Sequence, residues 1–170
     1  STIIHIRISI FLALNETDLA AKEALLAIKI SKDKDKFALV YDTIRVFEDD
    51  AIKKIFDEIY RKYKNEYLAN FYYAQILINV SEYQKAVKVI ENSYKFEEFS
   101  KKESRWGIFL ANAYYELGKN EQSIKILKDY LSYSPKDLYL NQYYVKILTL
   151  QENYDEAIKH YRFMSANKLI

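Results

Sequence analysis

The side chains that most often carry out catalysis are scarce in this sequence and do not form a catalytic pattern. The two histidines, His5 and His160, lie near opposite ends of the chain, and neither belongs to a ligand motif. There is no cysteine, which excludes disulfides, thiolate metal sites and cysteine nucleophiles. Phosphate-binding glycine loops, HExxH helices and GxSxG turns are also absent. We therefore predict that the protein is not an enzyme and that it uses no metal or cofactor.

Pairs of adjacent acidic residues are the remaining candidates for acid–base chemistry. Asp49-Asp50 follows Glu48 at the expected start of a helix, where negative charge complements the helix dipole. Glu97-Glu98 lies in a polar and aromatic connection. Both pairs are interpreted as helix-end or solvated charges rather than as a catalytic dyad.

Tyrosine is the side chain that stands out for binding. The chain has 17 tyrosines, and all but Tyr41 lie after residue 59. Tyrosine offers a large contact area at a small entropic cost, together with a hydroxyl group at its tip. Three pairs of tyrosines are adjacent in the sequence: Tyr72-Tyr73, Tyr114-Tyr115 and Tyr143-Tyr144. Adjacent side chains point about 100° apart on a helix, so one tyrosine of each pair is expected in the core and the other near the surface.

The composition indicates a globular, nearly all-helical protein of 170 residues. Hydrophobic residues make up 50% of the chain, while two glycines and one proline are too few for the turns of a β-rich fold. The formal net charge is only +2, and no basic run is concentrated enough to neutralise phosphates, so nucleic acid is not an expected partner. Residues 1–14 are mostly apolar, but the segment is short and contains His5 and Arg7. It therefore predicts a core helix rather than a membrane span.

Apolar residues recur at helical spacing in pairs of runs, which predicts five helical hairpins. The clearest pair is the stretch Ser104–Asp137, which has Gly118 between its runs and Pro135 after the second. Ala51, Ala86, Ser123 and Ala157 each lie early in a second run, at separations of 35, 37 and 34 residues, and Ala20 lies 31 residues before Ala51. The expected hairpins cover residues 1–31, 35–66, 67–100, 104–134 and 135–170.

Helix ends are predicted from capping residues. We expect Gly118 to take the left-handed conformation after a helix, and Ser134 to cap a helix that has Pro135 as its first residue. Three further N-terminal caps are expected at Ser81 with Gln84, Ser100 with Glu103, and Asn153 with Glu156.

The last three hairpins share a motif at a period near 34 residues. Its residues are Tyr73-Ala74, Leu77, Tyr83, Ala86 and Ile90; Leu110-Ala111, Tyr114, Gly118, Ser123, Leu127 and Pro135; and Tyr144-Val145, Leu148, Asn153-Tyr154, Ala157 and Tyr161. This pattern resembles the tetratricopeptide repeat (TPR) family over about residues 67–170. Trp106 is one residue further from Leu110 than in that family, and Gly107 stands in its place.

The resemblance implies an all-α fold, a right-handed superhelical solenoid of antiparallel hairpins that forms one domain over residues 1–170. A non-repetitive helical bundle is the alternative that the sequence leaves open. Because the last hairpin ends on apolar residues, we expect that end to contact further chain or another subunit. These residues are Met164, Leu169 and Ile170.

The resemblance also implies a concave groove that binds a peptide segment or a partner helix. Asn112 is the strongest candidate, because an amide can pair with both the N–H and the C=O of a peptide. The family's clamp for chaperone carboxylates is not matched, since Ile108 and Tyr143 occupy clamp positions. The groove positions transferred from the family are Phe71, Gln75, Ile78, Asn79, Arg105, Ile108, Asn112, Tyr115, Glu116, Tyr139, Gln142, Lys146 and Thr149.

Two functions fit such a groove. The first is a protein-interaction scaffold, and the second is a peptide-sensing regulatory domain of a larger signalling or transcription-regulating protein. In both, the partner is a protein or a peptide. A groove without a dedicated ligand is the third possibility.

Overall fold

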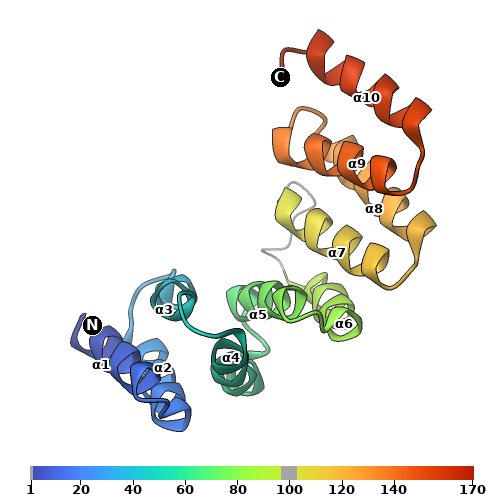
Figure 1. Cartoon of the computed structure of the whole chain (residues 1–170). Helices are drawn as coiled ribbons and strands as arrows, with labels where there is room; N and C mark the ends of the chain where they lie inside the picture. The colour runs from blue at the N-terminus through green and yellow to red at the C-terminus, as the bar shows by residue number, and fades with distance from the viewer. Residues whose placement is uncertain (1, 97–102) are drawn as a thin grey trace. The chain divides into compact units, whose positions relative to one another are not determined.

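The computed structural model describes residues 2–96 and 103–170, and in both ranges the chain consists of helices joined by short connections (Figure 1). Within these ranges it forms ten α-helices and no strand, which confirms the predicted all-α class. None of the helices described is long and apolar enough to cross a membrane. The helices are α1 (Thr2–Ala13), α2 (Thr17–Ile30), α3 (Lys36–Ile44), α4 (Asp49–Tyr63), α5 (Tyr67–Asn79), α6 (Tyr83–Ser93), α7 (Ser104–Glu116), α8 (Asn120–Tyr133), α9 (Leu138–Leu150) and α10 (Tyr154–Ala166).

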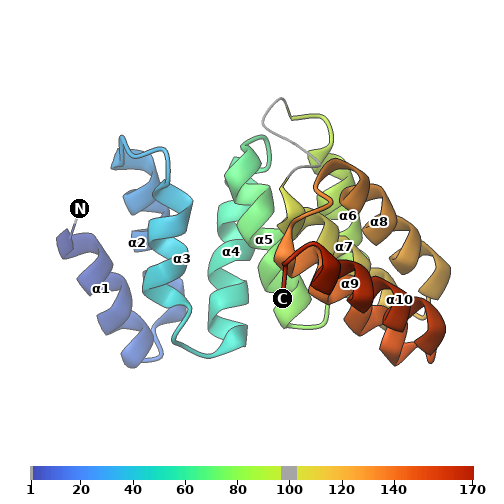
Figure 2. The ribbon, with the colours of Figure 1, turned by 90° about the horizontal axis from the view of Figure 1, so that it is seen from above.

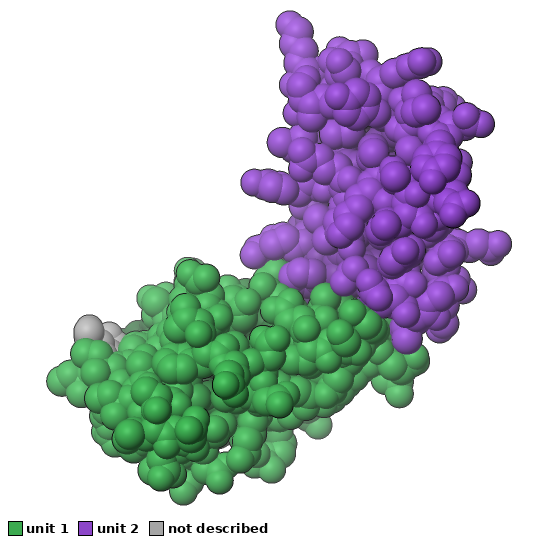
Figure 3. Space-filling view, viewed as in Figure 1, with its two compact units in different colours: residues 1–93 green, residues 94–170 purple. Residues whose placement is uncertain are grey.

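The helices fall in pairs within the five predicted hairpins (Figure 2). Four pairs pack closely against each other: α1 with α2, α5 with α6, α7 with α8, and α9 with α10. The second hairpin is less regular, because α3 packs on α1, α2 and α5, whereas α4 packs on α2 and α5. The chain divides into two compact units, residues 1–93 (unit 1) and residues 94–170 (unit 2), shown in different colours in Figure 3.

Small residues mark the close helix contacts, as the period predicts. Ala20, Ala86 and Ser123 have no exposed surface, and Ala157 is 6% exposed. The Ser123 hydroxyl donates to the carbonyl of Ala111 at 2.8 Å, so this position is polar but satisfied. In these four hairpins, the absence of a longer side chain allows the second helix to approach the first. Ala51, in the less regular second hairpin, is only half-buried.

The four regular hairpins turn through three residues each, at 14–16, 80–82, 117–119 and 151–153. The middle residue of each turn has positive φ: Asn15 (60°), Ser81 (62°), Gly118 (71°) and Glu152 (58°). After α7, the N–H groups of Gly118 and Lys119 donate to the carbonyls of Tyr115 and Tyr114 at 2.9 and 2.8 Å. This pair of bonds is the Schellman motif, which satisfies the last carbonyls of a helix. The prediction for Gly118 is confirmed.

The predicted cap at Ser81 is wrong. Ser81 is the left-handed residue that ends α5, and α6 begins at Tyr83. The sequence pattern did not indicate this role, because a side chain other than glycine is disfavoured at positive φ. The predicted cap at Ser100 lies outside the described residues.

The predicted cap at Ser134 is also wrong, because Ser134 and Pro135 lie in the connection that precedes α9. Asp137 caps α9 instead, and its carboxylate accepts a hydrogen bond from the Leu140 N–H at 2.9 Å. The other oxygen of this carboxylate accepts from the Ser104 hydroxyl at 2.8 Å, which ties the start of α9 to the start of α7. Asn153 directly precedes α10, as predicted, but its side chain makes no capping bond.

Two buried asparagines hold the connections that lead into α5 and α9. The Asn70 amide donates to the carbonyls of Lys64 and Glu66, both at 2.8 Å. Asn141 is the fourth residue of α9, as Asn70 is of α5, and it donates to the carbonyls of Pro135 and Asp137 at 3.0 and 2.7 Å. Both asparagines are nearly inaccessible, at 1% and 0% exposure. The carbonyls of Glu66 and Asp137 also accept from the backbone N–H of the same asparagine, so the amide supplies the additional bond that holds the carbonyl of Lys64 or Pro135 in the connection.

His160 is a structural residue, as the sequence predicts. Its Nε2 lies 2.7 Å from Asn141 Oδ1, and its ring packs edge-on against Tyr144 with centroids 4.7 Å apart. Because the Asn141 amide nitrogen already donates to two carbonyls, its oxygen is the acceptor and His160 Nε2 is the donor. Burial lowers the pKa of His160, so the ring is neutral at pH 7.

The tyrosine pairs divide between core and surface at two of the three predicted places. Tyr73 is buried beside a half-buried Tyr72, and Tyr144 is buried beside a half-buried Tyr143. Tyr114 and Tyr115 are both half-buried, so the third pair does not follow the prediction.

The apolar residues near the end of the last hairpin differ in their exposure. Met164 is only 2% exposed and belongs to the core of unit 2, so it cannot take part in the contact expected at that end. Leu169 is half-buried, and Ile170 is 50% exposed.

The glycine that replaces the expected tryptophan makes room for a large side chain from the next helix. A Cβ atom at Gly107 would lie 2.5 Å from Cγ of Tyr130, and Tyr130 is fully buried. Trp106, one residue earlier, is also fully buried. Trp106 is thus in the core although it lies one residue earlier than in the TPR family. The residue after it is a glycine, and the Tyr130 ring occupies the space that a side chain would take there.

We predict that Gly107→Ala lowers the free energy of unfolding by about 1–3 kcal/mol, because the added methyl group collides with the Tyr130 ring. Urea unfolding measures this change. In the double variant Gly107→Ala/Tyr130→Leu, the collision is relieved, so its cost should be smaller than the sum of the two single costs. Additive costs would contradict the proposed contact.

Candidate functional site

The groove residues predicted for unit 2 lie on one accessible side of α7 and α9, two helices that pack against each other. The buried side of α7 is formed by other residues, including Trp106, Leu110 and Ala113. We call the accessible side the α7–α9 face. Its half-buried members are Ile108, Asn112 and Tyr115, and its exposed members are Arg105, Glu116, Tyr139, Gln142, Lys146 and Thr149.

Asn112 occupies the α7 side of this face and is held in a fixed orientation. The Tyr143 hydroxyl, on α9, donates to Asn112 Oδ1 at 2.7 Å. The ammonium group of Lys146 lies 5.2 Å from the centroid of the Tyr143 ring. The carbonyl that was expected to accept from a peptide is therefore already bonded within the unit, and the Nδ2 amide group is the part of Asn112 left to donate to a partner.

Three of the nine members of the α7–α9 face are charged, namely Arg105, Glu116 and Lys146. Arg105 forms an ion pair with Glu103 at 2.8 Å. The Thr149 hydroxyl donates to the carbonyl of Val145 at 2.9 Å. The face thus combines aromatic, amide and charged groups, and tyrosine is the type among them that is enriched at protein-binding surfaces.

The predicted groove residues of unit 1 are less accessible. Phe71 is 2% exposed and belongs to the core, so its ring does not form part of an open face. The Gln75 amide donates to the Tyr41 hydroxyl at 2.9 Å and links α5 to α3. Ile78 is half-buried and Asn79 is exposed. In unit 1, the transferred positions therefore serve mainly in packing between helices.

Unit 1 contains a hollow that the sequence did not predict, between α1 and α3. Its volume is about 530 Å³, and aliphatic side chains such as Ile6 and Ile10 line it. The sequence signal was present, because α1 is apolar around most of its circumference, and a helix of that kind is normally covered on all sides. That signal was interpreted only as evidence for a core helix.

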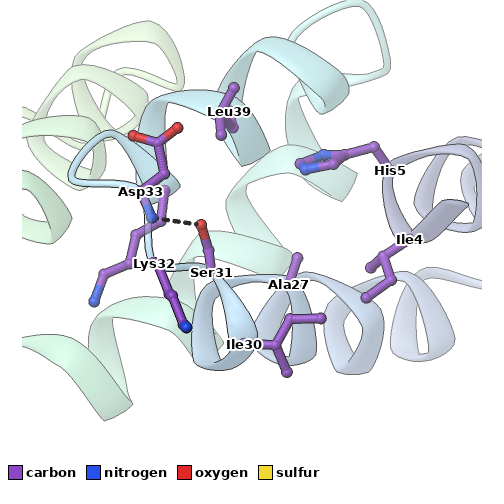
Figure 4. Close-up of a pocket in the computed structure, with 9 residues that line it drawn as sticks. Ile4, His5, Ala27, Ile30, Ser31, Lys32, Asp33 and Leu39 are labelled. Atoms are coloured by element: carbon purple, nitrogen blue, oxygen red, sulfur yellow. Dashed lines mark hydrogen bonds between the residues drawn. The ribbon is translucent and has the colours of Figure 1, made fainter. Parts of the chain in front are cut away.

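A smaller pocket of about 250 Å³ lies beside the connection between α2 and α3 (Figure 4). Its residues come from α1, α2, α3 and that connection, and they include Ile4, His5 and Ala27. The drawn hydrogen bond joins the Asp33 N–H to the Ser31 hydroxyl at 3.1 Å and stabilises the connection itself. His5 Nδ1 is bonded to the Thr43 hydroxyl at 2.8 Å. These polar groups therefore have structural roles.

Ionisable side chains gather where α4, α5 and α6 meet. The Asp57 carboxylate accepts from the Tyr73 hydroxyl and lies 2.7 Å from Lys53 Nζ and 3.4 Å from Lys85 Nζ. Glu82 lies 3.1 Å from the same Lys53 group. Burial acts to raise the pKa of Asp57, but the bonds from Lys53 and Tyr73 outweigh it and hold that pKa below its usual value. The cluster is an internally neutralised network that joins helices.

No group of three or more potential metal-ligating side chains comes together in the ranges that the structure describes. The two histidines bond to Thr43 and Asn141.

No family model matches the sequence, and no curated protein matches it. Solved structures with a similar fold include several of MamA, a TPR-like helical repeat protein. The structure of MamA from residue 41 to its end, from Desulfovibrio magneticus RS-1, is 14% identical, with a TM-score of 0.69 over 97% of this chain and 93% of that one. MamA AMB-1 is 15% identical, with a TM-score of 0.60 over 99% of this chain and 98% of that one. The likeness shows the fold, a TPR-like helical repeat solenoid.

Asp57 should make the stability depend on pH. Because its pKa is lower in the folded chain than the value of about 3.9 expected after unfolding, its stabilisation is fully present above about pH 4 and is lost as the pH falls through the folded-state pKa. We expect Asp57→Asn to cost about 1 kcal/mol at neutral pH, a value reduced by solvent screening at this partly exposed group. Urea unfolding at several pH values should show the difference from the wild type shrinking below about pH 4. Asp155→Asn, at an exposed acid of α10, is the control. A difference for Asp57→Asn that does not change with pH would contradict the assignment.

Proposed function

We propose that this protein is an interaction scaffold that holds a segment of a partner protein against the α7–α9 face. The observation that carries the proposal is the bond from Tyr143 to Asn112, which fixes an amide donor on an accessible surface. A donor that is already oriented loses little entropy on binding, so it favours one arrangement of the partner's backbone.

The composition of the α7–α9 face supports a protein partner. Tyr139 is 73% exposed and Tyr115 is half-buried, so the face has aromatic contact area on both helices. The amide groups of Asn112 and Gln142 supply hydrogen bonds without the desolvation cost of a charge. The similarity in fold to the MamA structures also supports a scaffold function.

The same features support a function other than catalysis. The ionisable clusters that we describe are paired internally, and the histidines bond to structural partners. The MamA structures share this helical repeat fold, an architecture that often presents extended binding surfaces.

We predict that Asn112→Asp weakens the binding of the partner segment by about ten- to a hundredfold, which corresponds to about 1–3 kcal/mol. The substitution keeps an oxygen for the Tyr143 hydroxyl but removes the Nδ2 donor. The full chain and its Asn112→Asp variant are used as baits for cross-linking and mass spectrometry. A segment captured only by the wild type is then synthesised, and its affinity is measured by calorimetry.

Gln122→Glu is the matched control, because it makes the same change from amide to carboxylate at an exposed position of α8. This control should bind the segment as the wild type does, and both variants should keep the wild-type melting temperature within a few degrees. Equal affinity of the Asn112→Asp variant and the wild type would reject the α7–α9 face as the binding site.

A further inference from the structure

We propose that a pocket between α8, α9 and α10 of unit 2 binds a free α-amino acid with an apolar side chain. This inference goes beyond the proposed scaffold function and does not depend on it. We call this site the α8–α10 pocket. Its volume is about 340 Å³, and its lining includes Lys128 and Leu131 of α8, Tyr144 of α9, and Glu156 and Phe163 of α10.

Tyr144 supplies a buried polar group to the pocket. The residue is only 2% exposed, and its hydroxyl has no hydrogen-bond partner among the residues that the structure describes. Leaving a buried hydroxyl without a partner costs free energy, which an acceptor on a ligand would recover. Because Tyr144 belongs to the buried side of α9, this group is separate from the exposed residues of the α7–α9 face.

Two side chains of opposite charge line the pocket without neutralising each other. Lys128 comes from α8, and Glu156 comes from the first turn of α10. Neither forms an ion pair within the part of the chain that the structure describes. Both act on Tyr144: burial raises the pKa of this tyrosine, Lys128 acts to lower it, and Glu156 acts to raise it. The Lys128 ammonium group does not reach the geometry of a hydrogen bond with the hydroxyl, so all three groups are available to a ligand.

The other polar side chains of the pocket have partners within unit 2. The Ser132 hydroxyl donates to the carbonyl of Asp129 at 2.6 Å. The Asn141 amide nitrogen donates to the carbonyl of Pro135 at 3.0 Å, and the Asn141 oxygen accepts from His160 Nε2 at 2.7 Å. These bonds join α9, α10 and the connection before α9, so the walls of the pocket are formed before a ligand binds. Binding to a preformed site loses little entropy.

The two charges select a ligand that carries both an anion and a cation. The carboxylate of an α-amino acid would accept from Lys128 and from the Tyr144 hydroxyl, while its ammonium group would donate to Glu156. A ligand with one charge would be attracted by one of these side chains and repelled by the other. A neutral ligand would remove both charges from water without pairing them, which is unfavourable.

The remainder of the lining selects an apolar side chain. Leu131 is half-buried, Phe163 is 40% exposed, and Pro135 adds further apolar surface. The rings of His160 and Phe163 lie 5.4 Å apart and are tilted by 31°, so they form one aromatic wall. A volume of about 340 Å³ is at the small end of the range for ligand pockets, roughly 300–1,000 Å³. The pocket therefore suits a single amino acid rather than a longer peptide.

The test uses L-phenylalanine and three related compounds with the full chain. Phenethylamine lacks the carboxylate, 3-phenylpropionate lacks the ammonium group, and glycine lacks the apolar side chain. Affinity is measured by calorimetry, and the contacted residues are mapped from NMR chemical shifts. We expect phenylalanine to shift the resonances of Tyr144, His160 and Phe163. Each of the other compounds should bind at least about tenfold more weakly, because each leaves part of the pocket unpaired or uncovered.

Lys128→Met and Glu156→Gln should each weaken the binding of phenylalanine by at least about tenfold, because each removes one charge and keeps a side chain of similar length. Lys125→Met and Glu121→Gln are the matched controls, since both residues are exposed on α8 and neither lines the pocket. The controls should bind as the wild type does. Circular dichroism establishes that all four variants are folded.

Tyr144→Phe separates a ligand-binding role of the hydroxyl from a structural one. Because the hydroxyl has no partner within the described chain, its removal should leave the melting temperature of the ligand-free protein unchanged or raise it slightly. The same variant should bind phenylalanine about three- to tenfold more weakly. Tyr161→Phe is the control, at a tyrosine of α10 that is 56% exposed.

Four results would overturn the inference. The first is the absence of any shift at the α8–α10 pocket when phenylalanine is added. The second is equal affinity for phenylalanine and for the two compounds that lack a charge. The third is unchanged affinity of the folded Lys128→Met, Glu156→Gln and Tyr144→Phe variants. The fourth is a lower melting temperature of ligand-free Tyr144→Phe, which would show that the hydroxyl is bonded within the protein.

Discussion

The fold depends on reversing the chain within three residues between antiparallel helices. A turn this short leaves the last carbonyls of the first helix without donors unless one residue adopts positive φ. Asn15, Ser81, Gly118 and Glu152 all do so, and the same two backbone bonds form around each of them. The connection between α3 and α4 lacks such a residue, and these two helices pack mainly on their neighbours. Close packing within a hairpin therefore accompanies the left-handed turn in this chain.

The connections between hairpins present a different problem, which is solved by side chains. Asn70 and Asn141 each donate two hydrogen bonds to the carbonyls of the connection before their helix. Before α7, the corresponding fourth residue is Gly107, and the space is taken by Tyr130 from α8. At the fourth residue of these helices, the chain thus carries either an amide that bonds to the preceding connection or a glycine against which an aromatic ring packs.

The two units present surfaces of different chemistry. The α7–α9 face carries an amide donor oriented by Tyr143 and surrounded by exposed aromatic and amide groups. The hollow between α1 and α3 is lined mainly by apolar side chains, and its two hydroxyl groups bond within unit 1.

The sequence by itself determined the helices, their grouping into five hairpins and the small residues at close contacts, because each of these follows from local periodicity. The resemblance to the TPR family supplied all nine members of the α7–α9 face, and their spacing of three and four residues agrees with one side of each helix. Only the tertiary structure decided that Ser81 ends a helix, that Asn141 bonds to the connection before α9, and that Tyr143 occupies the carbonyl of Asn112. It also decided that Phe71 is buried and that one side of α1 is left uncovered. These outcomes depend on which groups meet across different helices, and a pattern along one helix does not specify its neighbours.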